Sequence, residues 1–142
     1  MDNSTPLTYH FVVDGNDFSS AGEASVKVKK ILREIGFDAE LIRAVSIAMY
    51  EAEINMVIHA GGGEADVFVY PDKIVLVLTD HGPGIPDINI AMSEGFSTAP
   101  DNIRALGFGA GMGLPNIKRY SDELDIQSEL GKGTKITITV YS

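Results

Sequence analysis

The sequence contains no cysteine among its 142 residues, which excludes a disulfide-stapled scaffold and any metal site built from thiolates. Basic residues are few, with 11 lysines and arginines against 20 aspartates and glutamates and a net charge of −9. Proteins that bind nucleic acid neutralise phosphates with clustered Lys and Arg, and the sequence has no such cluster. Only three histidines occur, none at ligand spacing from the acids. We therefore expect neither a nucleic-acid partner nor a zinc site.

Long apolar segments are also missing. The first ten residues, MDNSTPLTYH, have neither the basic nor the apolar region of a signal peptide. No apolar run approaches the roughly 18–20 residues that span a bilayer. These absences predict a cytoplasmic protein with no membrane contact. With 44% hydrophobic residues the chain can bury one core, and we expect residues 1–142 to form a single domain.

Hydrophobic patterns predict an alternation of strands and helices. Strands are expected at 7–13, 64–70, 73–80, 123–129 and 134–140, and helices at 18–35, 39–60, 88–92 and 114–121. Their order predicts an α/β protein, a two-layer sandwich in which helices cover one face of a mixed, mostly antiparallel sheet. The segment IVLVL at 74–78 is apolar at every position, so we expect a central strand that is covered on both faces.

The helix expected at 39–60 carries polar residues along its buried side. At about 100° per residue, a core-facing stripe is formed by Leu41, Val45, Ala48 and Ala52. Glu51, Asn55 and His59 follow one another at i, i+4 and i+8 along the flank of this stripe. Glu53 points almost the opposite way, and we expect its side chain in water.

A carboxylate beside a buried face needs a partner or a function, because its desolvation is costly. Two interpretations of the polar residues on this helix remain open. Glu51 serves a site, or it reaches solvent at the boundary while Asn55 caps a neighbouring loop. For His59 a structural role is favoured, in which the imidazole interacts with the helix C-terminus and the glycines that follow it.

Asp80, Gly82 and Gly84 follow the central strand in the segment DHGPG. An acid at the end of such a strand, followed by a tight turn, is typical of the ligand-binding edge of α/β proteins. A carboxylate only accepts hydrogen bonds, which suits an exocyclic amino group such as that of adenine. The alternative is an aspartate that caps its own turn.

A glycine occupies every second position in the segment GFGAGMG at 107–113. Ordering glycine costs more entropy than ordering any other residue, and the residues between these glycines are apolar, unlike those of a flexible linker. Alternating glycines allow backbone N–H groups to surround phosphate oxygens, and the helix expected from Leu114 adds free N–H donors. The spacing matches neither a P-loop nor a dinucleotide-binding motif. The long irregular stretch at 93–113 is typical of a lid or a binding loop.

Three motifs therefore occur in a fixed order along the chain. They are Glu51-x-x-x-Asn55, Asp80-x-Gly82-x-Gly84 and Gly109-x-Gly111-x-Gly113. In this order they resemble the N, G1 and G2 boxes of the GHKL ATPase superfamily, which includes gyrase, Hsp90, histidine kinases and MutL. The segment GKGTKITI at 131–138 resembles the superfamily's late Gly-x-Gly-Thr turn and strand. The resemblance covers about residues 39–141 and implies a Bergerat-type ATP-binding fold.

Within the superfamily the chain is most similar to small bacterial serine kinases of partner-switching systems, namely the anti-sigma-factor kinases and the stressosome switch kinase. The segments EGFSTAP at 94–100 and GAGMGLPNIKRYSDELDIQS at 109–128 favour the switch-kinase branch. Some of these kinases carry an arginine near the third glycine box, whereas here Arg104 lies further upstream. The chain also has no phosphoacceptor-histidine helix pair, so it does not resemble a complete sensor kinase.

The resemblance implies ATP and Mg²⁺ as cofactors and gives roles to individual residues. Glu51 is the implied base that orients and deprotonates the attacking hydroxyl, either a serine of a partner or a water molecule. Asn55 is the implied protein ligand of Mg²⁺. Asp80 accepts from the adenine amino group, and Thr134 bridges to the base through water.

The remaining implied ATP contacts come from glycine-rich segments. Gly82 and Gly84 belong to the base-binding turn, where Gly84 allows close approach. Residues 93–113 are the implied lid. The backbone expected around the phosphates is that of Gly107, Gly109, Gly111, Met112, Gly113 and Leu114.

The implied function is an ATP-dependent serine/threonine-protein kinase that phosphorylates a serine of an antagonist-like protein. The rival hypothesis is a nucleotide-gated binding module that sequesters or activates a regulatory partner with little or no turnover. The sequence leaves open whether a sigma factor or a phosphatase also binds. It also leaves open whether the first strand and first helix form a homodimer face.

Overall fold

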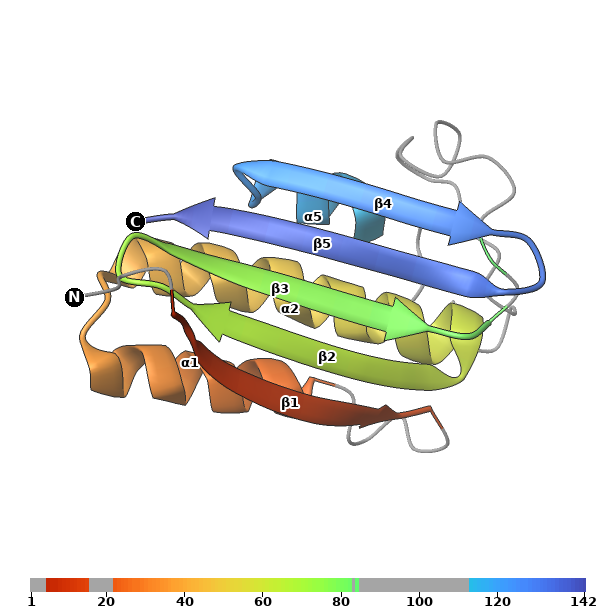
Figure 1. Ribbon diagram of the computed structural model, residues 1–142, viewed down its shortest axis with the longest axis horizontal. Helices are drawn as coiled ribbons and strands as arrows, with labels where there is room; N and C mark the ends of the chain where they lie inside the picture. The colour runs from red at the N-terminus through yellow and green to blue at the C-terminus, as the bar shows by residue number, and fades with distance from the viewer. Residues whose placement is uncertain (1–4, 16–21, 83, 85–112) are drawn as a thin grey trace.

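The computed structural model describes residues 5–15, 22–82, 84 and 113–142. The strands are β1 (Leu7–Asp14), β2 (Gly62–Val69), β3 (Lys73–Asp80), β4 (Glu123–Glu129) and β5 (Gly133–Tyr141). They form one sheet in the order β1-β2-β3-β5-β4, and each neighbouring pair is antiparallel. The helices are α1 (Glu23–Ile35), α2 (Ala39–Ala60) and α5 (Gly113–Arg119). They lie on one face of the sheet, as Figure 1 shows, which confirms the two-layer α/β sandwich.

The bounds of α2 coincide with the predicted range 39–60 because a capping residue is present at each end. At the N-terminus the side chain of Asp38 accepts a hydrogen bond of 2.8 Å from the backbone N–H of Leu41. At the C-terminus Gly61 adopts a φ of +73°, and its N–H donates to the carbonyl of Met56. The predicted stripe of this helix is buried against the sheet, at Leu41, Val45, Ala48 and Ala52.

The core lies between α2 and the helix-facing side of the three middle strands. Val67, Leu76 and Ile138 pair side by side across β2, β3 and β5, and all three are buried. Because side chains alternate between the faces of a sheet, the residues two positions away in each strand continue the same apolar surface. This surface and the buried residues of α2 form one core.

The prediction for residues 74–78 is right about position and wrong about coverage. β3 is the middle strand of the sheet, and Ile74, Leu76 and Leu78 are buried beneath the helices. Val75 and Val77 lie on the other face, where they are only half-buried. In the part of the chain that the structure describes, all helices cover the same face (Figure 1). An apolar run alone does not distinguish a strand covered twice from one whose valines pack beside neighbouring strands.

The prediction that the first helix begins at residue 18 is also wrong at its N-terminus. α1 begins at Glu23, and its N-cap Gly22 has a left-handed φ of +95°. The helix expected at 88–92 and the irregular stretch expected from 93 to 112 lie outside the described residues. None of the described helices combines the length and apolar character needed to cross a bilayer. The expectation of a cytoplasmic location stays a prediction.

Candidate functional site

Several segments end together at one edge of the sheet, beside the last turn of α2 (Figure 1). Asp80 at the end of β3 pairs with Thr134 of β5, and Thr134 pairs with Ser128 of β4. The turn after β3 packs closely on α2, because a Cβ built on Gly82 would lie 2.5 Å from the Cβ of Ala60. Only glycine fits this approach, so the strand end and the helix end are held against each other.

Asp80 is fixed by two backbone hydrogen bonds that both end on its Oδ1. The N–H of Gly82 donates at 3.0 Å and closes the turn, and the N–H of Thr134 donates at 3.1 Å from β5. The expected alternative, an aspartate capping its own turn, is therefore present in the structure, together with a second contact across strands. The hydroxyl of Thr134 is buried and lies 2.9 Å from the hydroxyl of Ser128. A polar row thus crosses three strands at this edge.

Gly84 continues this edge with a backbone conformation that other residues rarely adopt. Its φ is +82°, and a Cβ built on it would lie 2.6 Å from the carbonyl oxygen of Glu129, at the end of β4. Both facts require glycine at this position. The backbone of Gly84 therefore lies directly against the end of β4.

Glu51 lies half-buried on α2, and burial raises the pKa of its carboxyl. The side-chain amide of Asn116, in α5, donates a hydrogen bond to this carboxylate and lowers the pKa in part. The carboxylate of Glu51 therefore has a partner on α5, and its service in a site stays a prediction. Asn116 is a partner of Glu51 that the sequence did not reveal. In the sequence it is a polar residue beside Leu114 and Ile117, which are buried in the core.

Asn55 and His59 are half-buried along the same side of α2 as Glu51. Burial lowers the pKa of His59, and the nearby negative charge of Asp80 raises it in part. The close approach of Gly82 to Ala60 places the C-terminal end of this row beside the end of β3, one turn of helix beyond Asn55. The residues expected on α2 and on β3 therefore belong to one region of the fold.

The prediction that Glu53 points into water is wrong. Its side chain is 1% exposed, and its carboxylate accepts hydrogen bonds from the backbone N–H groups of Gly22, Ala24 and Ser25 at the start of α1. A helical wheel with a single buried face does not describe α2. α2 packs against the sheet on one side and against α1 on another, so a position opposite the first stripe is buried as well.

The predicted phosphate-binding segment is described only at its end. Gly107, Gly109, Gly111 and Met112 lie outside the described residues, as does Arg104. Gly113 opens α5, and Leu114 is buried in the core. Pro115 lies in the first turn of this helix, as expected, so the helix that follows the glycine segment begins where the sequence placed it.

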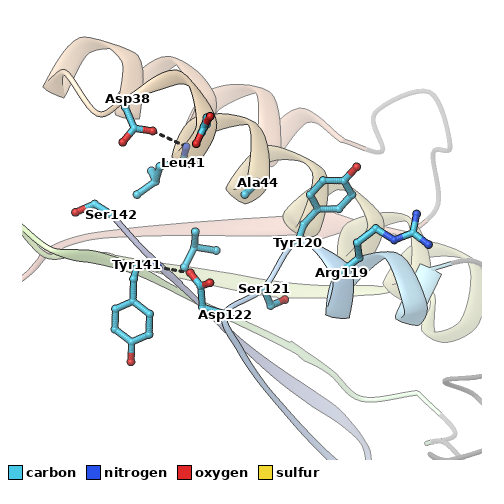
Figure 2. Close-up of a pocket in the computed structure, with 11 residues that line it drawn as sticks. Asp38, Leu41, Ala44, Arg119, Tyr120, Ser121, Asp122, Tyr141 and Ser142 are labelled. Atoms are coloured by element: carbon cyan, nitrogen blue, oxygen red, sulfur yellow. Dashed lines mark hydrogen bonds between the residues drawn. The ribbon is translucent and has the colours of Figure 1, made fainter.

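A hollow of about 310 Å³ lies at the opposite end of α2 (Figure 2). Asp38, Leu41 and Ala44 line it from the start of this helix, and Arg119 and Tyr120 line it from the end of α5. At 1.5 Å rise per residue, the fourteen residues from 41 to 55 correspond to about 21 Å along the axis. The hollow is therefore separate from the edge that holds Asn55 and Asp80.

The chain matches a known protein family over most of its length. A family model described as a histidine kinase-like ATPase domain matches residues 16–140. The chain belongs to this family. The resemblance drawn from the three motifs is thereby confirmed, and the use of ATP follows from the family.

Individual relatives agree with the family assignment. The serine/threonine-protein kinase RsbT of Bacillus subtilis (strain 168) is 33% identical over 112 residues, covering 76% of this chain and 78% of RsbT. An anti-sigma F factor of Caldanaerobacter subterraneus is 34% identical over 107 residues, covering 72% of this chain and 71% of that protein.

A solved structure supports the fold of this ATPase-family domain. The RsbU and RsbW domains of a Mycobacterium tuberculosis protein match with a TM-score of 0.63 and 18% identity, over 94% of this chain and 32% of the other. At this identity the likeness shows a shared fold. This chain spans about a third of that longer protein.

Proposed function

We propose that the chain is a serine/threonine-protein kinase of a bacterial partner-switching system, which transfers the γ-phosphoryl group of ATP to a serine of an antagonist-like protein. The observation that carries the proposal is Glu51, whose pKa is raised by burial and whose carboxylate is hydrogen-bonded by Asn116. A general base is most effective when its pKa approaches the working pH. Burial therefore moves the pKa of Glu51 in the direction that proton abstraction requires.

The side chains at the described edge fit ATP and Mg²⁺. In the described part of the chain both hydrogen bonds to Asp80 end on Oδ1, which leaves Oδ2 to accept from the adenine amino group. The side chain of Asn55 offers an amide oxygen, the kind of hard ligand that Mg²⁺ takes singly while it keeps waters and phosphate oxygens. When bound, Mg²⁺ neutralises charge on the phosphates.

Glu51 acts on the acceptor hydroxyl in this proposal. Its carboxylate takes the serine proton while the serine oxygen bonds to the γ-phosphorus, and the bond from that phosphorus to the leaving oxygen of ADP breaks. The side-chain amide of Asn116 donates a hydrogen bond to this carboxylate. Such a base contributes about 10²–10⁴-fold in rate.

The experiment is phosphoryl transfer from labelled ATP to a purified antagonist-like protein, the substrate class proposed above, measured for the wild type and for Glu51→Gln. We expect the variant to lose about 10²–10⁴-fold in rate, with ATP affinity within a few-fold of wild type. Glu40→Gln, an exposed change on the same helix, serves as the matched control and should retain activity. Equal transfer rates for wild type and Glu51→Gln would refute the proposal. Partner binding that depends on ATP, without transfer by the wild type, would support the nucleotide-gated binding module instead.

The names of the relatives support the choice of substrate class. One relative is a serine/threonine-protein kinase and another is an anti-sigma F factor. We extend this pairing of activities to the present chain as a proposal. Binding of a sigma factor or a phosphatase, assignment to the switch-kinase branch and formation of a homodimer stay predictions.

A further inference from the structure

Glu53 is a buried carboxylate on the helix that carries Glu51 and Asn55, and the proposed mechanism gives it no chemical step. Its side chain is 1% exposed. Its Oε2 accepts from the N–H of Gly22 at 3.1 Å and of Ala24 at 3.3 Å, and its Oε1 accepts from the N–H of Ser25 at 2.6 Å. Removing a carboxylate from water is costly. The hydrogen bonds from three backbone N–H groups offset this cost, and they indicate that Glu53 serves the start of α1.

The carboxylate of Glu53 replaces the local cap that α1 lacks. The N-cap of α1 is Gly22, which has no side chain of its own to accept a capping hydrogen bond. The first N–H groups of a helix have no partner within the helix, and its N-terminus favours negative charge. Ser25 closes the arrangement, because its hydroxyl donates to the carbonyl of Gly22 at 2.8 Å. The start of α1 is thus hydrogen-bonded to Glu53 of α2.

The three hydrogen bonds between Glu53 and the start of α1 also restrict the rotation of α2 about its own axis. Two residues correspond to about 200° around a helix, so Glu53 projects away from both Glu51 and Asn55. A helix with side chains has a radius of about 5–6 Å, so a rotation of about 10° moves a side-chain tip by about 1 Å. A misplacement of about 1 Å can reduce a catalytic rate by about 10²-fold.

Apolar packing alone holds the rotation of α2 less strictly than these hydrogen bonds do. Met49, Ala52 and Met56 are buried on α2, and apolar contacts of this kind tolerate small shifts because they have no preferred direction. Hydrogen bonds weaken steeply as their angle departs from linearity. Three of them on one carboxylate therefore define an orientation.

We propose that Glu53 is a positioning residue of the phosphoryl-transfer site, which sets the orientation of Glu51 and Asn55 by anchoring the opposite side of α2 to the N-terminus of α1. The proposal rests on the function proposed above for these two residues. It assigns no contact between Glu53 and substrate.

The experiment compares Glu53→Met, which keeps a side chain of similar length without acceptors, with Glu53→Gln, which keeps one acceptor oxygen. Leu32→Ala is the matched control, because it removes buried core contacts of α1 without touching the start of that helix. All proteins are assayed well below their melting temperatures. We expect kcat to fall about 10- to 100-fold in Glu53→Met, to fall less in Glu53→Gln, and to stay within twofold of wild type in Leu32→Ala.

A second readout does not depend on kinase activity. The NMR signals of the Asn116 side-chain amide report the hydrogen bond to Glu51, and they can be assigned with Asn116→Ser. We expect these signals to shift in Glu53→Met and Glu53→Gln and to stay in place in Leu32→Ala. Unshifted signals in both Glu53 variants overturn the positioning role. Shifted signals together with an inactive wild type support the positioning role and refute the kinase function instead.

Discussion

Replacing Asp80 by asparagine separates the structural role of this residue from its proposed role in binding adenine. An asparagine NH₂ group cannot accept a hydrogen bond, so the two N–H donors of Gly82 and Thr134 require the amide oxygen at the position of Oδ1. The NH₂ group then occupies the position of Oδ2. Two donors would face each other where Asp80 is proposed to accept from the adenine amino group.

The magnitude follows from the bonds that are kept and lost. Hydrogen bonds to a charged group contribute about 1.5–3 kcal/mol, which corresponds to about 10- to 150-fold in Kd for ATP. The stability of Asp80→Asn should be close to wild type, because both backbone bonds remain. Asp80→Ala loses both bonds, and at a partly exposed site this costs about 2 kcal/mol, or about 4–8 °C in melting temperature.

Titration calorimetry with ATP and with GTP, together with thermal melts of each variant, tests this prediction. GTP carries a carbonyl where ATP carries the amino group, so Asp80→Asn should weaken ATP and improve GTP relative to wild type. An ATP Kd within threefold of wild type in Asp80→Asn, with no change in GTP binding, would refute the assignment of Asp80 to the adenine base. A fall in melting temperature as large as that of Asp80→Ala would refute the assignment of both backbone bonds to Oδ1.

Two further predictions concern the proposed general base Glu51 and the glycines of two turns, Gly84 and Gly131. The pH profile of kcat/KM should fall on its acid side with a pKa above the ordinary glutamate value of 4.5, because burial raises the pKa of Glu51. The base form of Glu51 is lost as pH falls through that pKa. An acid-side pKa at or below 4.5 would contradict the assignment of Glu51 as the general base. Gly131→Ala, at a φ of +79° in open space, should cost about 1–2 kcal/mol of unfolding free energy. Gly84→Ala should cost about 1–3 kcal/mol more, because its Cβ also meets the carbonyl of Glu129. Urea unfolding measures both costs, and equal values would contradict the close contact.

Local signals were sufficient for most helices and strands. α2 begins after the N-cap Asp38 and ends before Gly61, and both residues could be recognised in the sequence because capping depends on near neighbours. β3 matched its predicted range for a similar reason, since turn residues bound its apolar run. Glu51 and Asp80 were singled out because they lie in motifs whose order resembles that of a family, and their roles stay predictions.

What the sequence did not reveal depends on tertiary contacts. Glu53 was misplaced because its burial arises from α1, which packs on a second side of α2. The start of α1 was misplaced for the same reason, because its cap comes from a residue about thirty positions later in the chain. Asn116 was missed because its contact with Glu51 exists only once α5 is docked on α2. The glycines at 107–111 are recognisable by spacing, and their binding role stays a prediction.

The shared oxygen of Asp80 has a consequence for ligand selection. One carboxylate atom holds both the turn after β3 and the first residues of β5, so the remaining oxygen is oriented by the sheet itself. An acceptor preorganised in this way loses little conformational entropy when a base arrives. Under the role proposed for Asp80, discrimination between nucleobases would therefore be built into the rigid layer of the domain.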